Sequence, residues 1–343
     1  MVGVRKRGEE IRQFILENVE QHPSDLVSIT ASHFLISRQA VNKHIKKLVE
    51  QKAIVVQGAT KSRRYSLHPL DEWSHTYSLE NKLEEDIVWQ NDIATFLKEL
   101  PDNIKEIWHY AFTEMLNNAI DHSSGSWVSI KVEKTASTTK IMILDDGEGI
   151  FKKIQRELGL SDERHSVLEL AKGKLTTDPN HHSGEGIFFS SRMFDRFAIS
   201  SGSTYFSHEF DKTEDWIIEQ KENKSGTAVF MYLSNNSSRT SKSVFDNFTS
   251  DDDYGFTKTI VPVRLAQYGD DQLISRSQAK RLLARVDKFK KVIFDFDEVS
   301  TIGQSFADEI FRVFQLQHKD MELVAINTQK QVQQMISRAL SKE

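Results

Sequence analysis

Apolar residues in the first 70 positions follow a helical spacing and then change to short alternating runs. The apolar positions of the first helical segment, EEIRQFILENVEQ, are Ile11, Phe14, Ile15 and Val19. Two shorter helical patterns follow, and Ser37 is a suitable N-cap for the second one, from Arg38 to Gln51. The runs AIVVQG and YSLH flank the basic turn ATKSRR and predict two short strands.

The middle of the chain opens with a helical pattern that has two different faces. The positions of its apolar face are Trp108, Phe112, Met115 and Ala119. In FTEMLNNAIDHS (112–123), Glu114, Asn118 and Asp121 share another side, because residues three, four and seven apart lie on one face of a helix. Downstream, SWVSIKVE, KIMILDDGEGI and KSGTAVFMYL predict strands, and HHSGEGIFFSSRMFD predicts a helix that two glycines precede.

Strand and helix patterns alternate in the last part of the chain, from TIVPVRLAQYG to QKQVQQMISRAL. This alternation predicts a small sheet covered by helices. Two polar stretches separate the parts: DEWSHTYSLENKLEED (71–86), and residues 234–255, which are rich in Ser, Asn and Asp and are typical of a linker or mobile loop. The sequence therefore predicts a multidomain α+β protein with domains at 1–70, 78–233 and 258–343.

Composition narrows the function classes. The chain has 343 residues, of which 38% are hydrophobic and 28% charged, and its net charge of −5 gives no global reason to expect nucleic-acid binding. It has no cysteine, which excludes disulfides and thiol catalysis. No apolar run approaches the ~20 residues of a membrane span, and the basic start lacks the apolar core of a signal peptide. We expect a cytoplasmic protein without a membrane partner.

The first 70 residues resemble the winged helix-turn-helix family, whose second helix enters the DNA major groove. The resemblance implies base contacts from the start of that helix, by Ser37, Arg38, Gln39, Asn42 and Lys43. It implies phosphate contacts from the wing, by Lys61, Arg63 and Arg64. Double-stranded DNA is the expected partner. The alternative is a protein-docking module, because winged helices also serve that purpose.

Four short motifs occur in a fixed order in the middle segment: Glu114-x-x-x-Asn118, Asp145-x-Gly147-x-Gly149, Gly184-x-Gly186 and Gly226-Thr227. Their order and spacing resemble the GHKL ATPase superfamily of gyrases, heat-shock chaperones, mismatch-repair ATPases and histidine kinases. The resemblance covers residues 80 to 233 and implies a Bergerat-type α/β sandwich that binds ATP and Mg²⁺.

Roles for the acidic and amide residues follow from this resemblance. Asn118 would offer its carbonyl oxygen to Mg²⁺, and Glu114 would activate water or a hydroxyl as general base. Asp121 would approach the nucleotide near its sugar or base. Asp145 would accept a hydrogen bond from the adenine amino group, since an ionised carboxylate is acceptor-only.

The small residues complete the site that the resemblance implies. Gly147 and Gly149 would let the backbone pass close to the base. Gly184 and Gly186 would offer N–H groups to the phosphates, and Thr227 would reach adenine through water.

Two features of the segment before Gly184 bear on phosphate binding. His182 stands where many family members carry a third glycine. The resemblance therefore leaves open how tightly this loop would wrap around the phosphates. Residues 151–183 would form a lid over ATP, in which Lys172 and Lys174 are candidate phosphate contacts. A solvated lid face explains these two lysines equally well.

The last segment resembles the STAS-like domains, relatives of anti-sigma-factor antagonists. The position that a kinase phosphorylates in that family corresponds approximately to Ser305. The surrounding Gly-Gln-Ser-Phe departs from the family's Asp-Ser-Ser-Gly, which favours Ser305 as a helix N-cap instead. This domain is a candidate site for a protein partner.

The favoured hypothesis is a regulator that couples ATP binding and Mg²⁺-dependent hydrolysis to the winged helix and the STAS-like domain. The alternative is a serine/threonine protein kinase of the anti-sigma type that acts on Ser305 or on a partner. A third hypothesis, an ATP sensor without turnover, is disfavoured by Glu114. A histidine kinase is not expected, because His75 and His109 lack the acidic, proline-containing context of a phospho-acceptor. The sequence does not determine the oligomeric state, and a homodimer is one possibility.

Overall fold

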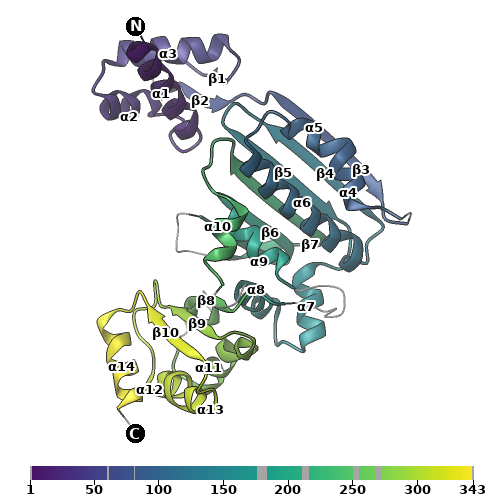
Figure 1. Cartoon of the computed structure of the whole chain (residues 1–343), viewed down its shortest axis with the longest axis vertical. Helices are drawn as coiled ribbons and strands as arrows, with labels where there is room; N and C mark the ends of the chain where they lie inside the picture. The colour runs from purple at the N-terminus through teal and green to yellow at the C-terminus, as the bar shows by residue number, and fades with distance from the viewer. Residues whose placement is uncertain are drawn as a thin grey trace.

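The computed structural model describes residues 2–59, 62–80, 82–175, 184–210, 216–249, 255–267 and 272–341. It is a multidomain α+β protein, with an N-terminal helical domain at one end, a large sheet in the middle and a smaller α/β domain at the other end (Figure 1). The two termini lie at opposite ends of the molecule (Figure 1). No helix in the described ranges is long and apolar enough to cross a membrane.

The N-terminal domain is formed by three helices and a two-stranded antiparallel hairpin. Its elements are α1 (Val2–Asn18), α2 (Leu26–Phe34), α3 (Arg38–Glu50), β1 (Ile54–Gln57) and β2 (Arg64–Leu67). Ser37 caps α3, since its Oγ accepts a hydrogen bond from the Ala40 backbone N–H at 3.2 Å. The predicted helix and its cap are therefore confirmed, with an end one residue earlier. The buried apolar residues of this domain form a core separate from that of the rest of the chain.

The central sheet has five strands in the order β3-β4-β5-β7-β6, and all neighbours are antiparallel. Their bounds are β3 (Asp71–Ser78), β4 (Trp127–Lys134), β5 (Thr138–Asp145), β6 (Arg196–Glu209) and β7 (Trp216–Ser234). The interpretation of 71–78 as a polar divider is wrong, because these residues form an edge strand. Trp73 and Tyr77 alternate with polar residues and pack on the core, which explains the strand.

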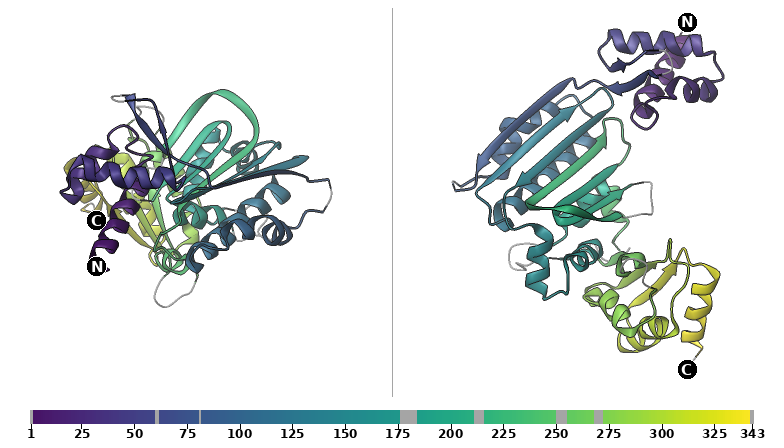
Figure 2. Two further views of the ribbon diagram at one scale, coloured as in Figure 1. Left: turned by 90° about the horizontal axis from the view of Figure 1, so that it is seen from above. Right: turned by 180° about the vertical axis from the view of Figure 1, so that it is seen from behind.

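Helices cover one face of this sheet, as the front and rear views show (Figures 1 and 2). The helices of this part are α4 (Glu85–Val88), the π-helical turn η2 (Trp89–Ile93), α5 (Ala94–Leu97), α6 (Asp102–His122), α7 (Ile150–Leu158), α8 (Glu163–Lys172), α9 (Gly186–Met193) and α10 (Ser241–Asp246). Of these, α7 and α8 lie between the sheet and the C-terminal domain (Figure 1). The predicted apolar face of α6 is confirmed: Trp108, Phe112 and Met115 are buried.

Helix α10 lies within the stretch predicted to be a linker, so that prediction is wrong for residues 241–249. Thr240 and Ser243 form a capping box at its start. Val244 and Phe248 are buried, and the Phe248 ring lies 4.9 Å from that of Phe188. The polar composition of the stretch led to the prediction of a linker, although these two apolar residues are four positions apart, a helical spacing.

The C-terminal domain contains a three-stranded parallel sheet, in the order β10-β9-β8, which confirms the predicted small sheet. Its elements are β8 (Lys258–Pro262), the 3-10 turn η3 (Val263–Ala266), α11 (Arg276–Leu283), the 3-10 turn η4 (Val286–Lys288), β9 (Lys291–Asp295), α12 (Gln304–Asp308), the π-helical turn η5 (Glu309–Phe314), α13 (Gln315–Gln317), β10 (Glu322–Ile326) and α14 (Lys330–Leu340).

Candidate functional site

A cavity of about 420 Å³ lies beside α6 on the helical side of the central sheet. Six of the nine residues predicted to bind nucleotide or perform its chemistry line it: Glu114, Asn118, Asp145, Gly184, Gly186 and Thr227. Asp121 is exposed and does not line the cavity. Gly147 and Gly149 lie just after Asp145, in the turn that leads into α7. The four motifs, which are distant in sequence, thus meet around one cavity.

Asp145 ends β5 and is buried at the cavity wall, with 6% of its surface exposed. Its Oδ1 accepts hydrogen bonds from the backbone N–H groups of Gly147, at 2.9 Å, and Thr227, at 3.2 Å. Burial raises the pKa of Asp145 and outweighs these two N–H groups, which lower it. Within the described residues, Oδ2 has no hydrogen bond. This oxygen is therefore the acceptor that Asp145 can offer to a ligand.

Thr227 and the turn after Asp145 hold each other in place. The Thr227 Oγ1 accepts a hydrogen bond from the Ile150 backbone N–H at 3.0 Å, at the start of α7. Ser123, at the end of α6, accepts one from the Glu148 N–H at 3.1 Å through its backbone oxygen. A Cβ on Gly147 would overlap this Ser123 carbonyl, so close approach of the two segments requires glycine.

Carboxylates gather at the other end of the cavity, where α9 begins. Gly186 packs so closely on α6 that a Cβ there would overlap the Glu114 carboxylate. Burial raises the pKa of the half-buried Glu185. Tyr110 also has a raised pKa, first because it is buried and then because the carboxylates of Glu114 and Glu185 are near.

Glu185 was missed by sequence reasoning, although a charged residue between the two glycines of Gly184-x-Gly186 was a visible signal. Its exposed fraction is intermediate, and it precedes α9 as the N-cap residue. Another missed residue is Lys153, which lines the cavity from α7. His182, at the questioned glycine position, and His181 lie outside the described residues.

Lys172 does not face the cavity, so its prediction as a phosphate contact is wrong. Its side chain is 1% exposed, and its Nζ lies 2.7 Å from Oε1 of Glu169. The same ammonium donates to the carbonyl oxygens of Arg281, at 3.1 Å, and Ala284, at 2.9 Å. Burial lowers the pKa of Lys172, and Glu169 opposes this change. Lys172 is thus part of a contact with the C-terminal domain.

Lys174 also contacts the C-terminal domain. Its Nζ donates to the Lys288 carbonyl oxygen at 3.1 Å and lies 4.9 Å from the centre of the Phe289 ring. The expected lid segment therefore has, up to residue 175, a function in holding two domains together. The positions of Lys172 and Lys174 depend on packing against residues more than 100 positions away in the sequence. No local sequence pattern could therefore predict them.

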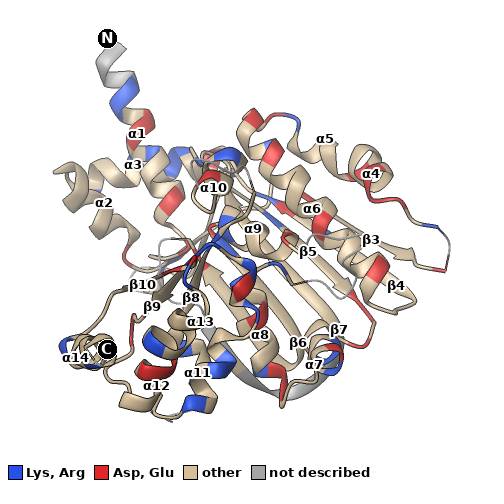
Figure 3. Cartoon of the chain, turned by 60° about the horizontal axis from the view of Figure 1, so that its bottom comes forward, with Lys and Arg blue, Asp and Glu red and all other residues tan. Residues whose placement is uncertain are grey.

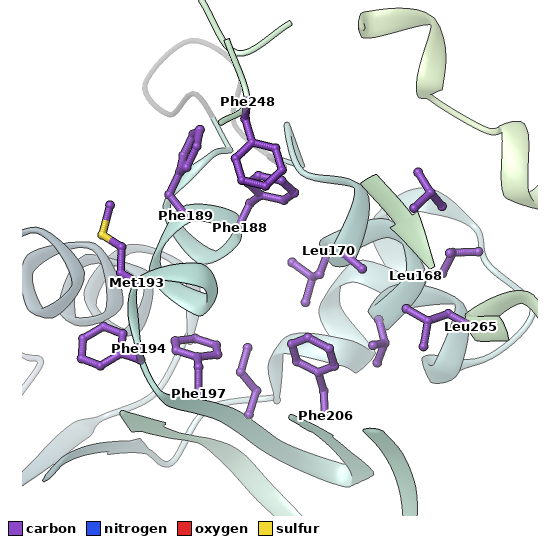
Figure 4. Close-up of a cluster of buried hydrophobic side chains, with 14 of the residues drawn as sticks. Leu168, Leu170, Phe188, Phe189, Met193, Phe194, Phe197, Phe206, Phe248 and Leu265 are labelled. Carbon is purple, nitrogen blue, oxygen red and sulfur yellow. The ribbon is translucent and has the colours of Figure 1, made fainter. Parts of the chain in front are cut away.

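Helix α8 is the element shared by the cavity and the C-terminal domain. Every side chain from His165 to Lys172 is buried, and Leu170 lines the cavity, as does Leu175 just after the helix. On the other side, Oγ1 of Thr259 in β8 donates to the Lys172 carbonyl oxygen at 2.7 Å. The close-up of this junction shows the side chains of Leu168 and Leu170 from α8 in one cluster with Leu265 of η3 (Figure 4).

The predicted DNA-contacting residues are at the surface of the N-terminal domain. The exposed ones are Ser37, Arg38, Gln39, Asn42, Lys43, Arg63 and Arg64. Lys61 lies outside the described residues. The Arg38 Nη2 donates to Ser28 Oγ at 3.4 Å, and the Ser37 hydroxyl is engaged in capping α3. Basic residues are visible on α1 and α3 in the charge-coloured view (Figure 3).

Ser305 is exposed in the first turn of α12. The favoured prediction that it caps this helix is wrong, because the N-cap residue is Gly303, with an extended backbone. Its hydroxyl is accessible at the surface of the C-terminal domain.

Comparison with known protein families identifies the C-terminal part. Residues 278–333 match the family described as a STAS-like domain of unknown function (DUF4325), which confirms the STAS-like resemblance. The match runs from α11 into α14. No curated protein matches the chain.

Proposed function

We propose that this chain is an ATP-binding regulatory protein of the GHKL type, with a DNA-binding winged helix and a STAS-like domain that responds to the nucleotide. The observation that carries the proposal is Asp145: a buried carboxylate with one oxygen held by two backbone N–H groups and the other available at a cavity wall. An acceptor held in this way suits an exocyclic amino group such as that of adenine.

The remaining cavity residues fit an adenine nucleotide that extends along α6. Gly184 and Gly186 offer backbone at the far end for phosphates. Asn118 lines the cavity between the two ends and supplies a neutral oxygen ligand suited to Mg²⁺. The described residues contain no group of three or more His, Cys, Asp or Glu side chains that could hold a metal ion. Phosphate oxygens would then supply ligands that the protein does not, which fits a metal that arrives with the nucleotide.

Glu114 is the residue for the chemical step. It lies one turn before Asn118 on α6 and lines the cavity beside Gly186. In that position its carboxylate would take the proton of a water that attacks the terminal phosphate, with release of ADP and phosphate. Mg²⁺, when bound, would neutralise charge on the phosphates.

Helix α8 supports the link between the nucleotide and the C-terminal domain. Leu170 lines the cavity, whereas Lys172, two residues later, is buried against the C-terminal domain. A ligand that displaces Leu170 must therefore also disturb the contacts of Lys172, because packed interiors do not deform independently over such a distance.

The exposed basic and amide side chains at the start of α3 support DNA binding by the N-terminal domain. Arg38 and Lys43 lie there with Gln39 and Asn42, types that pair with base edges. The net charge of −5 makes a local basic surface the source of any phosphate attraction.

The exposed hydroxyl of Ser305 favours a second candidate function, a serine/threonine protein kinase that modifies this residue or a partner. One experiment separates the two candidates: incubation with Mg²⁺ and γ-labelled ATP, followed by assay of free phosphate and of labelled protein. Free phosphate that is lost with Glu114→Ala supports an ATPase regulator. Label on the protein that is lost with Ser305→Ala supports the kinase.

Calorimetric titration with ATP and GTP tests the nucleotide site itself. We expect the wild type to prefer ATP, and Asp145→Asn to lose roughly tenfold or more of its affinity for ATP while its GTP affinity changes little. Because burial raises the pKa of Asp145 above its ordinary 3.8, ATP affinity should begin to fall at a higher pH on acidification than for an exposed aspartate. An equal loss of ATP and GTP binding by Asp145→Asn would refute the assignment of Asp145 to adenine.

A further inference from the structure

The charges of the cavity lining do not suit a polyanionic ligand by themselves. Glu114 and Asp145 contribute carboxylates, and among the described lining residues Lys153 is the one lysine or arginine. Phosphate groups placed near carboxylates in a partly enclosed site need a compensating cation. Lys153 is therefore the side chain to consider first for a contact with the ligand's charge.

Lys153 has unused hydrogen-bonding capacity. Its Nζ donates one hydrogen bond, to the His122 carbonyl oxygen at 2.8 Å, although an ammonium group has three donors. No carboxylate of the described residues lies within ion-pairing distance of it. Lys140 and Lys172, by contrast, have carboxylate partners at 3.0 Å and 2.7 Å.

The His122 contact also fixes where the ammonium lies. His122 is the last residue of α6, where the helix dipole places partial negative charge that stabilises a cation. This is the end of α6 that packs on the turn after Asp145, through Ser123 and Gly147. On α6, Glu114 lies about two turns before His122, or about 12 Å along the helix axis. Gly186 packs against Glu114 at that distant position.

We propose that Lys153 binds the α-phosphate of the nucleotide and so makes the site select 5′-nucleotides, AMP included, over nucleosides. With adenine at Asp145 and the terminal phosphates at Gly186, the α-phosphate is the first anionic group after the base and ribose. Lys153 is at the base end of the cavity and can reach that group with its two remaining donors. This inference rests on the proposed function. It adds that the site requires a 5′-phosphate on its ligand.

The test is calorimetric titration of the full chain with adenosine, AMP, ADP and ATP. Lys153→Met removes the charge and keeps the length of the side chain, Lys153→Arg keeps the charge, and Lys152→Met is the matched control, since Lys152 is an exposed neighbour that does not line the cavity. We expect Lys153→Met to weaken binding of all three nucleotides roughly tenfold, with adenosine affinity within about twofold of wild type. Lys153→Arg should recover most of the loss, and Lys152→Met should resemble the wild type.

Other results contradict the inference in separate ways. An equal loss for adenosine and AMP would show that Lys153 acts on the ribose or on the shape of the cavity. Unchanged affinities would show that it contacts no part of the ligand. Loss for ATP alone would place it at the terminal phosphates. If the wild type bound none of the four compounds, the proposed function itself would fail, whereas wild-type binding without an effect of Lys153→Met would overturn this inference alone.

Discussion

The two terminal domains are attached to the central sheet in very different ways. The N-terminal domain has its own core, against which Ala136 packs from the turn between β4 and β5, and it also contacts the sheet through polar side chains. Glu20 forms an ion pair with Lys140, at 3.0 Å, and accepts a hydrogen bond from the Tyr232 hydroxyl at 2.6 Å. The C-terminal domain instead shares a continuous apolar core with the central domain and encloses α8.

The two attachments also differ in their distance from the cavity. Lys140 and Tyr232 are five residues from Asp145 and Thr227 along β5 and β7, or about 17 Å. The C-terminal domain contacts α8 at Lys172, two residues from the cavity-lining Leu170. We infer that the C-terminal domain is placed to respond to a ligand in the cavity, while the N-terminal domain would act as a largely independent unit in the DNA binding proposed above.

The largest expected effect comes from breaking the buried pair at the C-terminal junction. Lys172→Met leaves Glu169 buried beside Arg285, whose Nε is 3.5 Å away, without its closest partner. We expect a loss of about 3–5 kcal/mol in the free energy of unfolding, because the buried Glu169 carboxylate loses its closest cation and the carbonyl groups of Arg281 and Ala284 lose their donor. Urea unfolding followed by circular dichroism measures it. The double substitution Glu169→Leu with Lys172→Met removes both charges and should recover much of this loss; a single variant within 1 kcal/mol of wild type would contradict the buried assignment.

A smaller and more local effect is expected from the wing of the N-terminal domain. Replacing the exposed Arg63 and Arg64 by Ala should weaken binding of double-stranded DNA and lower the slope of log K against log salt by about 2. Nucleotide affinity should stay the same, since the two sites lie in separately packed domains. Fluorescence anisotropy at several salt concentrations checks this. A protein-docking winged helix would show no salt-dependent DNA binding to lose.

The smallest effect should come from the N-terminal junction. Lys140→Met removes the ion pair with Glu20, but both side chains are about a third exposed, at 35% and 27%. We expect at most ~1 kcal/mol of destabilisation, since water and salt screen such pairs. Affinity for ATP should be unchanged by calorimetry. A clear drop in ATP affinity on Lys140→Met would contradict the separation of the N-terminal junction from the cavity.

The periodicity of apolar residues was sufficient to predict elements that depend mainly on their own sequence. The apolar face of α6 and the Ser37 cap of α3 follow from spacing and from one hydroxyl, and both are present. The strand–helix alternation of the last segment likewise predicted its small sheet covered by helices, and the structure adds that the strands are parallel. In such elements the sequence-local preference and the tertiary environment agree.

The elements that sequence reasoning missed depend on distant partners. Residues 71–78 are polar on average, yet they become a strand because β4 offers an edge to pair with. Lys172 resembles a solvated lid residue until the carbonyl groups of Arg281 and Ala284 enclose it. Lys153 lines the cavity only because α7 brings it there. The motifs could be identified from the sequence, whereas a cavity residue outside them, such as Lys153, could not.

Hydrogen exchange with and without Mg²⁺ and ATP, read by mass spectrometry, tests the central claim most directly. We predict slower exchange on ATP binding in α6 and α9 and also in α8 and the segment 276–288, with no change in α3. Protection confined to α6 and α9, or equal protection of α3 and 276–288, would contradict the claim that the nucleotide site communicates selectively with the C-terminal domain.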